Sequence, residues 1–152
     1  MAKEKFRAYV AAYLVLEKDG KILLLRRYNT GYQDGCYSLV AGHLEGHETV
    51  KQCIIREAHE EAGITLKLED LNVAHVMHRL SVDREYFDLY LKATTWSGEV
   101  TNKEPEKCDD LSWFPSASLP ETTLPEIKLA LANIERGIFY GEIGWKDEES
   151  IR

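Results

Sequence analysis

The sequence has few cysteines, no long apolar run and no excess of basic residues, and each absence excludes a class of protein. Its three cysteines, Cys36, Cys53 and Cys108, are odd in number, far apart and never spaced as Cys-x-x-Cys. Neither a disulfide framework nor a zinc site is therefore predicted, and reduced thiols in a cytoplasmic protein are expected. The early apolar run at residues 9–16 is too short to span a bilayer and lacks a signal-peptide cleavage site.

The charge of the chain is acidic. A formal net charge of -7 over 152 residues argues against a basic surface that binds nucleic acid. A small anionic substrate would therefore need a bound cation. With 44% hydrophobic and 30% charged residues, the chain has the composition of one folded domain with a real core. We expect no nucleic-acid polymer and no membrane as partners, and we leave a homodimer open.

Apolar runs separated by turn residues predict a sheet. Residues 6–29 hold two strand-like runs on either side of Asp19-Gly20, a pair that suits the positive φ angles of a tight hairpin. Further strands are expected at residues 36–42, 72–80, 85–96 and 111–115.

Two helices interrupt these strands. The first is predicted from Thr49, which can cap its start, to Ala62, and Gly63 can take the left-handed conformation that ends it. The second helix is predicted to begin at residues 124–125, where a proline suits the first turn, and to run up to Gly137. Strands and helices in this order predict a mixed α/β sandwich.

The first predicted helix has an acidic face. Glu57, Glu60 and Glu61 fall within about 100° of the helical wheel, beside an apolar arc of similar width. Like charges four residues apart disfavour a helix, and no lysine lies there to compensate them. Mg²⁺ is the natural partner, because this hard cation binds carboxylate oxygens together with water and phosphates. A solvated acidic face is the plainer alternative, and spacing alone does not exclude it.

The segment from residue 42 to residue 64 resembles the Nudix box, and every fixed position of that motif is filled. The matching residues are Gly42, Glu48, Arg56, Glu57, Ala58, Glu60, Glu61, Gly63 and Ile64. Upstream, residues 37–42 read Tyr-Ser-Leu-Val-Ala-Gly, where many members of the family have Trp-x-Leu-Pro-Gly-Gly. This departure concerns the backbone of the loop and leaves the glutamates of the helix in place.

The resemblance implies a fold and a reaction. The fold is an α/β/α sandwich with a mixed β-sheet, formed by a single Nudix hydrolase domain with a core from about residue 6 to residue 141 and a polar C-terminal tail. The reaction is hydrolysis of a pyrophosphate bond in a nucleoside diphosphate linked to another group, X. Water attacks one phosphorus and releases a nucleoside monophosphate.

By the same resemblance, Glu60 and Glu61 are metal ligands, and Glu57 is a ligand or the general base. The carbonyl oxygen of Gly42 can add a ligand. The cofactor is Mg²⁺, with Mn²⁺ as a substitute, and it would neutralise charge on the phosphate oxygens.

Three further charged residues resemble functional positions of the family. Arg56 and Glu48 resemble a supporting pair that orients the loop and the helix, which is also what an ordinary salt bridge would do. Glu104, placed by its distance from Trp96, resembles a distal metal ligand or base. The alternative for Glu104 is a solvated position in a charged loop.

Other candidates are weaker. Arg26 and Arg27 are adjacent residues of a strand, so one of them normally points to solvent and the other could contact phosphate oxygens. His75 and His78 are expected on opposite faces of their strand, each with a structural role. Candidate base-stacking residues are Tyr28, Tyr32, Tyr86, Phe87 and Trp113, although most aromatics in such a domain are core residues.

The substrate is predicted by exclusion. ADP-ribose-type members often carry a proline, and dinucleoside-polyphosphate types a tyrosine, at a set distance beyond the box, and residues 75–81 contain neither. The MutT-like branch, which converts a nucleoside triphosphate to a monophosphate and pyrophosphate, is favoured. An ADP-ribose or nucleotide-sugar pyrophosphatase, a non-catalytic nucleotide sensor and an acidic interaction domain remain alternatives.

Overall fold

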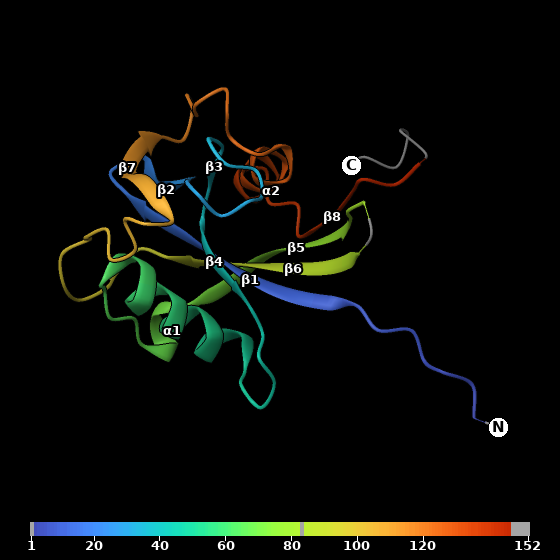
Figure 1. Ribbon diagram of the computed structural model, residues 1–152. Coiled ribbons are helices and arrows are strands. Elements are labelled where there is room, and N and C mark those ends of the chain that lie inside the picture. Colours follow the sequence, from blue (N-terminus) through green and yellow to red (C-terminus); the bar gives the residue numbers. More distant parts are fainter. Residues whose placement is uncertain (1, 83, 147–152) are drawn as a thin grey trace.

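The computed structural model describes residues 2–82 and 84–146, which form a mixed β-sheet and two α-helices (Figure 1). The strands are β1 (Tyr9–Lys18), β2 (Lys21–Arg27), β3 (Tyr37–Ser38), β4 (Val40–His43), β5 (Asn72–Leu80), β6 (Glu85–Ala93), β7 (Cys108–Pro115) and β8 (Tyr140–Ile143). The helices are α1 (Val50–Ala62), the short 3-10 helix η1 (Leu68–Asp70) and α2 (Pro125–Glu135).

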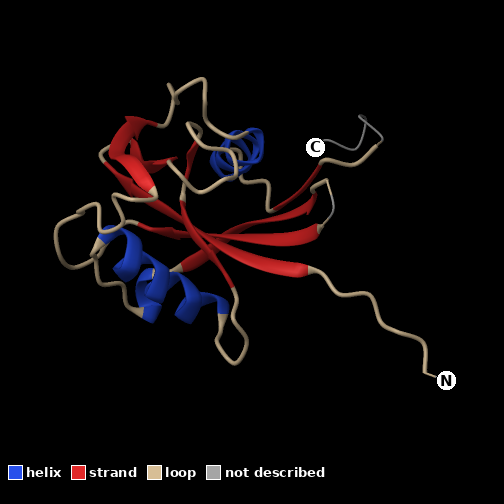
Figure 2. Ribbon diagram, in the orientation of Figure 1, coloured by secondary structure: helices blue, strands red, loops and turns tan. Residues whose placement is uncertain are grey.

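The predicted α/β/α sandwich is confirmed. The strand order is β3-β2-β1-β6-β5-β8, while β4 pairs with β1 and β7 pairs with β2. The β1–β6 and β5–β8 pairs are parallel and the other pairs antiparallel, so the sheet is mixed. Helix α1 packs on β4 and β1, whereas α2 packs on β5 and β8, and Figure 2 shows the two helices on opposite sides of the strands.

Local signals place the first hairpin and α1 as predicted. Asp19 and Gly20 have φ angles of 53° and 73°, which is the left-handed region that this tight turn requires. Thr49 accepts a hydrogen bond from the backbone N–H of Gln52, and the Gln52 side chain accepts one from the backbone N–H of Thr49. This reciprocal pair is a capping box. Gly63 ends the helix at φ 69°.

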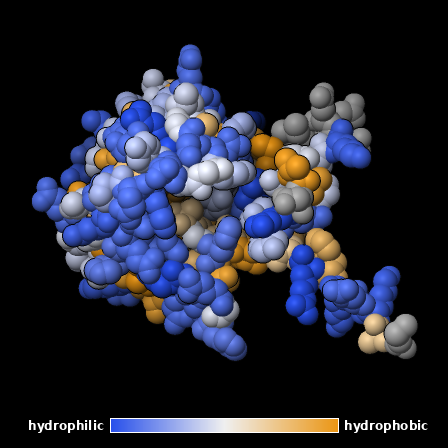
Figure 3. Space-filling model, in the orientation of Figure 1, coloured by the Kyte–Doolittle hydropathy of each residue, from blue (hydrophilic) through white to orange (hydrophobic). Residues whose placement is uncertain are grey.

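Two hydrophobic clusters separate the helices from the sheet. The cluster under α1 includes Cys53, Ile54, Ala58 and Ala62, packed on strand residues. The cluster under α2 includes Met77, Tyr90, Ile127 and Ala130. The solvent side of α1 is mostly hydrophilic in the space-filling view (Figure 3). Within residues 2–82 and 84–146, no helix is long and apolar enough to cross a membrane.

Several boundaries differ from the sequence prediction. The strand expected at residues 36–42 is two short strands interrupted at Leu39, because β3 pairs with β2 while β4 pairs with β1. Strand β7 starts at Cys108, and α2 ends at Glu135. Strand β8 was not predicted, since its four residues show no clear alternation. Of the polar tail, residues 147–152 lie outside the described residues.

The two histidines of β5 have the structural roles expected. His75 is fully buried, and its Nδ1 lies 2.9 Å from the carbonyl oxygen of Ile138. His78 lies on the other face of the strand, where its Nε2 is 2.9 Å from Glu85 and its ring stacks on Phe87. Burial lowers the pKa of His75, so this ring is neutral at neutral pH.

Candidate active site

The site is built where β4 passes beneath α1. The backbone of Gly42 lies so close to Glu57 that a methyl group at residue 42 would collide with the carboxylate. The φ angle of Gly42 lies outside the left-handed region, so glycine serves here to leave space for the Glu57 side chain and not to allow a special backbone conformation. The Gly42 carbonyl oxygen faces α1, where the Cys53 Sγ lies 3.8 Å away.

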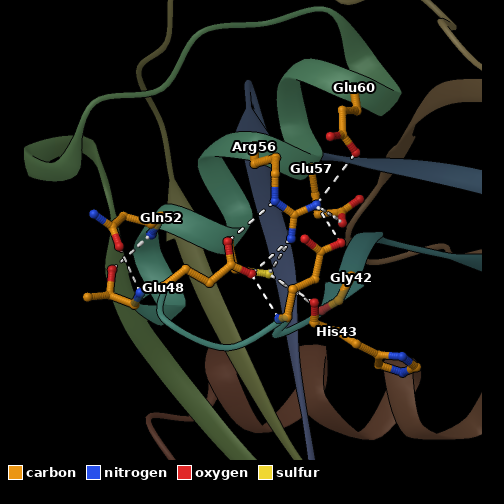
Figure 4. Close-up of polar contacts among 10 residues, drawn as sticks. Gly42, His43, Glu48, Gln52, Arg56, Glu57 and Glu60 are labelled. Atoms are coloured by element: carbon orange, nitrogen blue, oxygen red, sulfur yellow. Dashed lines mark hydrogen bonds and ion pairs between the residues drawn. The ribbon is translucent and has the colours of Figure 1, made fainter.

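Arg56 is the centre of an ionic network (Figure 4). Its guanidinium lies 2.9 Å from Glu48, 2.7 Å from Glu57 and 3.6 Å from Glu60. The predicted pairing of Arg56 with Glu48 is therefore present, and it joins the loop before α1 to the helix. The hydrogen bond from Arg56 holds the pKa of Glu48 below its usual range.

Glu61 occupies a different environment from its neighbours. It lines the cleft described below, and its carboxylate accepts a hydrogen bond of 3.2 Å from the backbone N–H of Ala41. Burial raises the pKa of Glu61 to about 9, with further contributions from the charges of Glu57, Glu104 and Glu60. Burial also raises the pKa of Glu57, against the opposing effect of Arg56. Burial and the neighbouring carboxylates therefore disfavour the charged form of Glu61 at this end of α1.

The loop that carries Glu104 is docked against the end of α1. The backbone N–H groups of Thr101 and Lys103 donate to the carbonyl oxygens of Ala62 and Glu61, at 2.9 and 3.1 Å. This docking explains why the charge of Glu104 acts on Glu57 and Glu61. The Glu104 loop therefore lies near enough to α1 for its charge to act on Glu57 and Glu61, although Glu104 is more than 40 residues away in the sequence.

The four glutamates suit a divalent cation in chemistry. They supply hard oxygen donors, and burial disfavours the charged form of Glu61, with the charges of neighbouring glutamates adding to this effect, a cost that a cation would offset. Among residues 2–82 and 84–146, however, no three His, Cys, Asp or Glu side chains already converge as a metal site. Glu57 instead points to Arg56, so binding a cation requires these side chains to reorient.

A cleft of about 540 Å³ opens beside Glu61. Arg27 lines it, whereas Arg26 pairs with Asp109 at 2.7 Å, so one of the two neighbouring arginines faces the cleft, as expected. Arg27 also donates to the carbonyl oxygen of Tyr32 at 2.7 Å. Tyr32 and Tyr86 are the predicted aromatics that line the cleft.

Sequence reasoning missed several cleft residues. Arg79 lines the cleft while its guanidinium donates to the fully buried Asp88 at 2.6 Å. Arg84 and Glu126 also line it. Strand alternation places Arg79 on the face of the buried His75, and a charged residue on a buried face was the signal that could have identified it.

The family model of the NUDIX domain matches residues 5–133, which covers strands β1 to β7, α1 and most of α2. The chain belongs to the NUDIX family. This NUDIX protein has the three glutamates Glu57, Glu60 and Glu61 of the box on α1, and one of them, Glu61, lines the cleft.

Solved structures and curated relatives agree with this assignment. A MutT NUDIX hydrolase from Burkholderia pseudomallei has a TM-score of 0.77 and 26% identity, over 84% of this chain and 98% of that chain. An ADP-ribose pyrophosphatase from Methanocaldococcus jannaschii is 40% identical over 72 residues, which are 45% of this chain and 42% of the relative. The NAD-capped RNA hydrolase NudC of Vibrio parahaemolyticus is 29% identical over 132 residues, 87% of this chain and 48% of the relative. This chain therefore spans less than half the length of these two curated relatives.

Proposed function

We propose that this NUDIX protein is a Mg²⁺-dependent hydrolase that cleaves a pyrophosphate bond in a nucleoside diphosphate linked to X. The proposed substrate is a nucleoside triphosphate, which gives a nucleoside monophosphate and pyrophosphate. The observation that carries the proposal is the placement of Glu61 and Gly42 in the cleft wall, with the Glu57 side chain beside Gly42. A cytoplasmic location remains our prediction.

Each residue of the site has a proposed role in this reaction. Glu60 and Glu61, with Glu57, would hold Mg²⁺ or Mn²⁺, and the carbonyl oxygen of Gly42 is the further candidate ligand. When bound, the ion supplies positive charge to the phosphate oxygens. Arg56 fixes the position of Glu57 through the 2.7 Å ion pair.

The bond changes define what the remaining groups must do. A water oxygen forms a new bond to one phosphorus, the bond from that phosphorus to the bridging oxygen breaks, and pyrophosphate leaves. The water must lose a proton to a carboxylate, and Glu57 and Glu104 are the two candidates. Arg27, at the cleft wall, is suited to contact phosphate oxygens of the substrate.

ADP-ribose is the second candidate substrate. The similarity to the ADP-ribose pyrophosphatase of Methanocaldococcus jannaschii, 40% over 72 residues, favours it. The same four glutamates would serve either substrate, because both contain a pyrophosphate bond.

A substrate panel tests the proposal. Nucleoside triphosphates, nucleotide sugars, ADP-ribose and dinucleoside polyphosphates are incubated with Mg²⁺, and all products are identified. We expect monophosphate and pyrophosphate from a triphosphate with the wild type and with Glu99→Gln, a matched control because Glu99 is an exposed glutamate of the same loop as Glu104. Folded Glu60→Gln should lose this activity. Cleavage of ADP-ribose alone would establish the second candidate, and nucleotide binding without any cleavage would favour the non-catalytic sensor.

A further inference from the structure

Three aromatic rings lie side by side next to the glutamates, and we call them the aromatic shelf. Tyr9 on β1 and Tyr86 on β6 are register partners, with ring centroids 5.4 Å apart. The ring of His43 on β4 lies 6.3 Å from Tyr9 and 5.7 Å from Tyr86. Figure 4 shows the His43 side chain pointing away from Arg56 and Glu57. The shelf therefore lies beside the glutamates and is not part of their ionic network.

Two of the three rings of the aromatic shelf belong to the wall of the cleft, and Tyr9 lies next to them. His43 and Tyr86 line the cleft directly. Tyr9 lies on the same face of β1 as Ala11 and Tyr13, which also line it, because alternate residues of a strand share a face. The shelf thus continues the cleft along β1, away from the glutamates.

The exposure of the shelf is unusual for a packing role. Tyr9 is 47% exposed although it begins a central strand, whereas Tyr86 beneath it is 8% exposed. The guanidinium carbons of Arg84 and Arg79 lie 5.0 Å from the Tyr9 ring and 4.1 Å from the Tyr86 ring. These cation–π contacts help to hold the rings in place. The result is a supported tyrosine pair whose outer ring, Tyr9, remains accessible.

We propose that the aromatic shelf stacks the base of the bound nucleotide and that Tyr9 makes the contact. This inference rests on the proposed function, which places the phosphates at the glutamates while the shelf takes the other end of the nucleotide. Every base has a π-face, so stacking tolerates different bases, and the larger purine rings stack more strongly than pyrimidines. The shelf therefore supplies affinity for nucleotides with a preference for purines.

Binding of two probes tests this contact without hydrolysis. AMP and ribose 5-phosphate share the sugar and the phosphate, only AMP has a base, and neither contains a pyrophosphate bond. Dissociation constants are measured by titration calorimetry for the wild type, Tyr9→Leu, Tyr9→Phe and Tyr140→Leu. Tyr140 is the matched control, because it is 48% exposed on β8 and does not line the cleft.

We expect Tyr9→Leu to weaken AMP binding about tenfold, the loss typical of one base-stacking ring. Ribose 5-phosphate should bind this variant and the wild type equally. Tyr9→Phe and Tyr140→Leu should bind both probes like the wild type, and the wild type should bind AMP more tightly than CMP.

Three results would overturn the inference: unchanged AMP binding by Tyr9→Leu, equal weakening of both probes, or no AMP binding by the wild type. If Tyr9→Leu does not fold, as judged by its thermal unfolding, His43→Ala removes the other exposed ring and gives the same test. Failure of the proposed function would be seen separately in the substrate panel. If AMP binding depends on Tyr9 but no substrate of the panel is hydrolysed, the aromatic shelf is still supported as a nucleotide-binding site.

Discussion

At the residue scale, Gly42 shows how close packing constrains the site. The Glu57 carboxylate fills the space that a side chain at residue 42 would need. A Cβ at this residue would therefore force the Glu57 side chain out of its observed position. Gly42 thus leaves room for the observed position of Glu57, in addition to the proposed role of its carbonyl oxygen as a metal ligand.

A double-mutant cycle tests this close approach. Gly42→Ala should destabilise the protein by about 1 kcal/mol, because the flexible Glu57 side chain moves aside and gives up its ion pair with Arg56, and it should lower turnover by displacing Glu57. In a Glu57→Ala background the collision is absent, so the same substitution should cost much less stability. Chemical unfolding of the four proteins measures both effects. Equal losses in the two backgrounds would show that Glu57 is not the colliding group.

A second prediction at this scale concerns Asp110, whose carboxylate accepts 2.5 Å hydrogen bonds from Ser112 and Tyr37. Both bonds lower the pKa of Asp110 below its usual value of 3.8, and the bond from Ser112 has the larger effect. A depressed pKa contributes stability above the unfolded pKa, and this stability is lost as the pH falls through the folded pKa.

Ser112→Ala should therefore destabilise the protein by about 1 kcal/mol at pH 7. The difference from the wild type should shrink progressively below pH 4, as Asp110 becomes protonated in the unfolded and then in the folded state. Thermal unfolding of both proteins between pH 2 and pH 7 measures this convergence. A difference that is independent of pH would assign the effect of Ser112 to packing alone.

At the element scale, the loop after β6 depends on one amide side chain. Asn102 accepts a hydrogen bond from the backbone N–H of Glu104 and donates one of 2.7 Å to the carbonyl oxygen of Cys108. Together with the docking of Thr101 and Lys103 on α1, these bonds fix where Glu104 lies. Asn102 is therefore a positioning residue for Glu104.

Asn102→Ala should reproduce the defect of Glu104→Gln. We expect turnover to fall about 10- to 100-fold, as is typical when a residue that orients a ligand is removed. Thermal stability should change little in Glu104→Gln, because the carboxylate is partly exposed. The measurement is the maximal rate with the best substrate of the panel. Unchanged turnover in folded Glu104→Gln would remove Glu104 from the site, and with it the proposed role of Asn102.

At the scale of the whole molecule, stability and catalysis are carried by separate parts of the structure. The two hydrophobic clusters lie under α1 and α2 and consist of apolar side chains. Glu60 is exposed on α1, Glu57 and Glu61 are partly buried there, and Glu104 lies on the docked loop. None of them belongs to either hydrophobic cluster. The fold therefore does not need a cation in order to bury its core.

Removal of divalent ions should abolish hydrolysis and leave the protein folded. With excess chelator we expect no product from the substrate panel, and re-addition of Mg²⁺ or Mn²⁺ should restore activity. The melting temperature without the ion should remain that of a cooperative folded domain, since the ion stabilises only in proportion to its binding. Activity that persists after complete removal of divalent ions would contradict the proposed function.

The sequence by itself determined the elements whose signals are local. The hairpin at Asp19-Gly20 and the limits of α1 follow from backbone preferences and capping within a few residues. The spacing of Glu57, Glu60 and Glu61 places them on one helical face for the same reason. The Nudix resemblance added Glu104 and the pairing of Glu48 with Arg56. The structure shows that ion pair, places Glu61 in the wall of the cleft and docks the Glu104 loop on the end of α1.

The tertiary structure decided what depends on pairing between distant segments. Strand β8 is short and gains its order only beside β5. Arg79 and Tyr86 enter the cleft because β5 and β6 pair in one register, and Tyr9 meets Tyr86 because β1 and β6 pair in parallel. Glu61 differs from Glu60 only because the fold buries it beside Ala41. Burial and cross-strand contact are properties of the assembled sheet, so no local sequence signal specifies them.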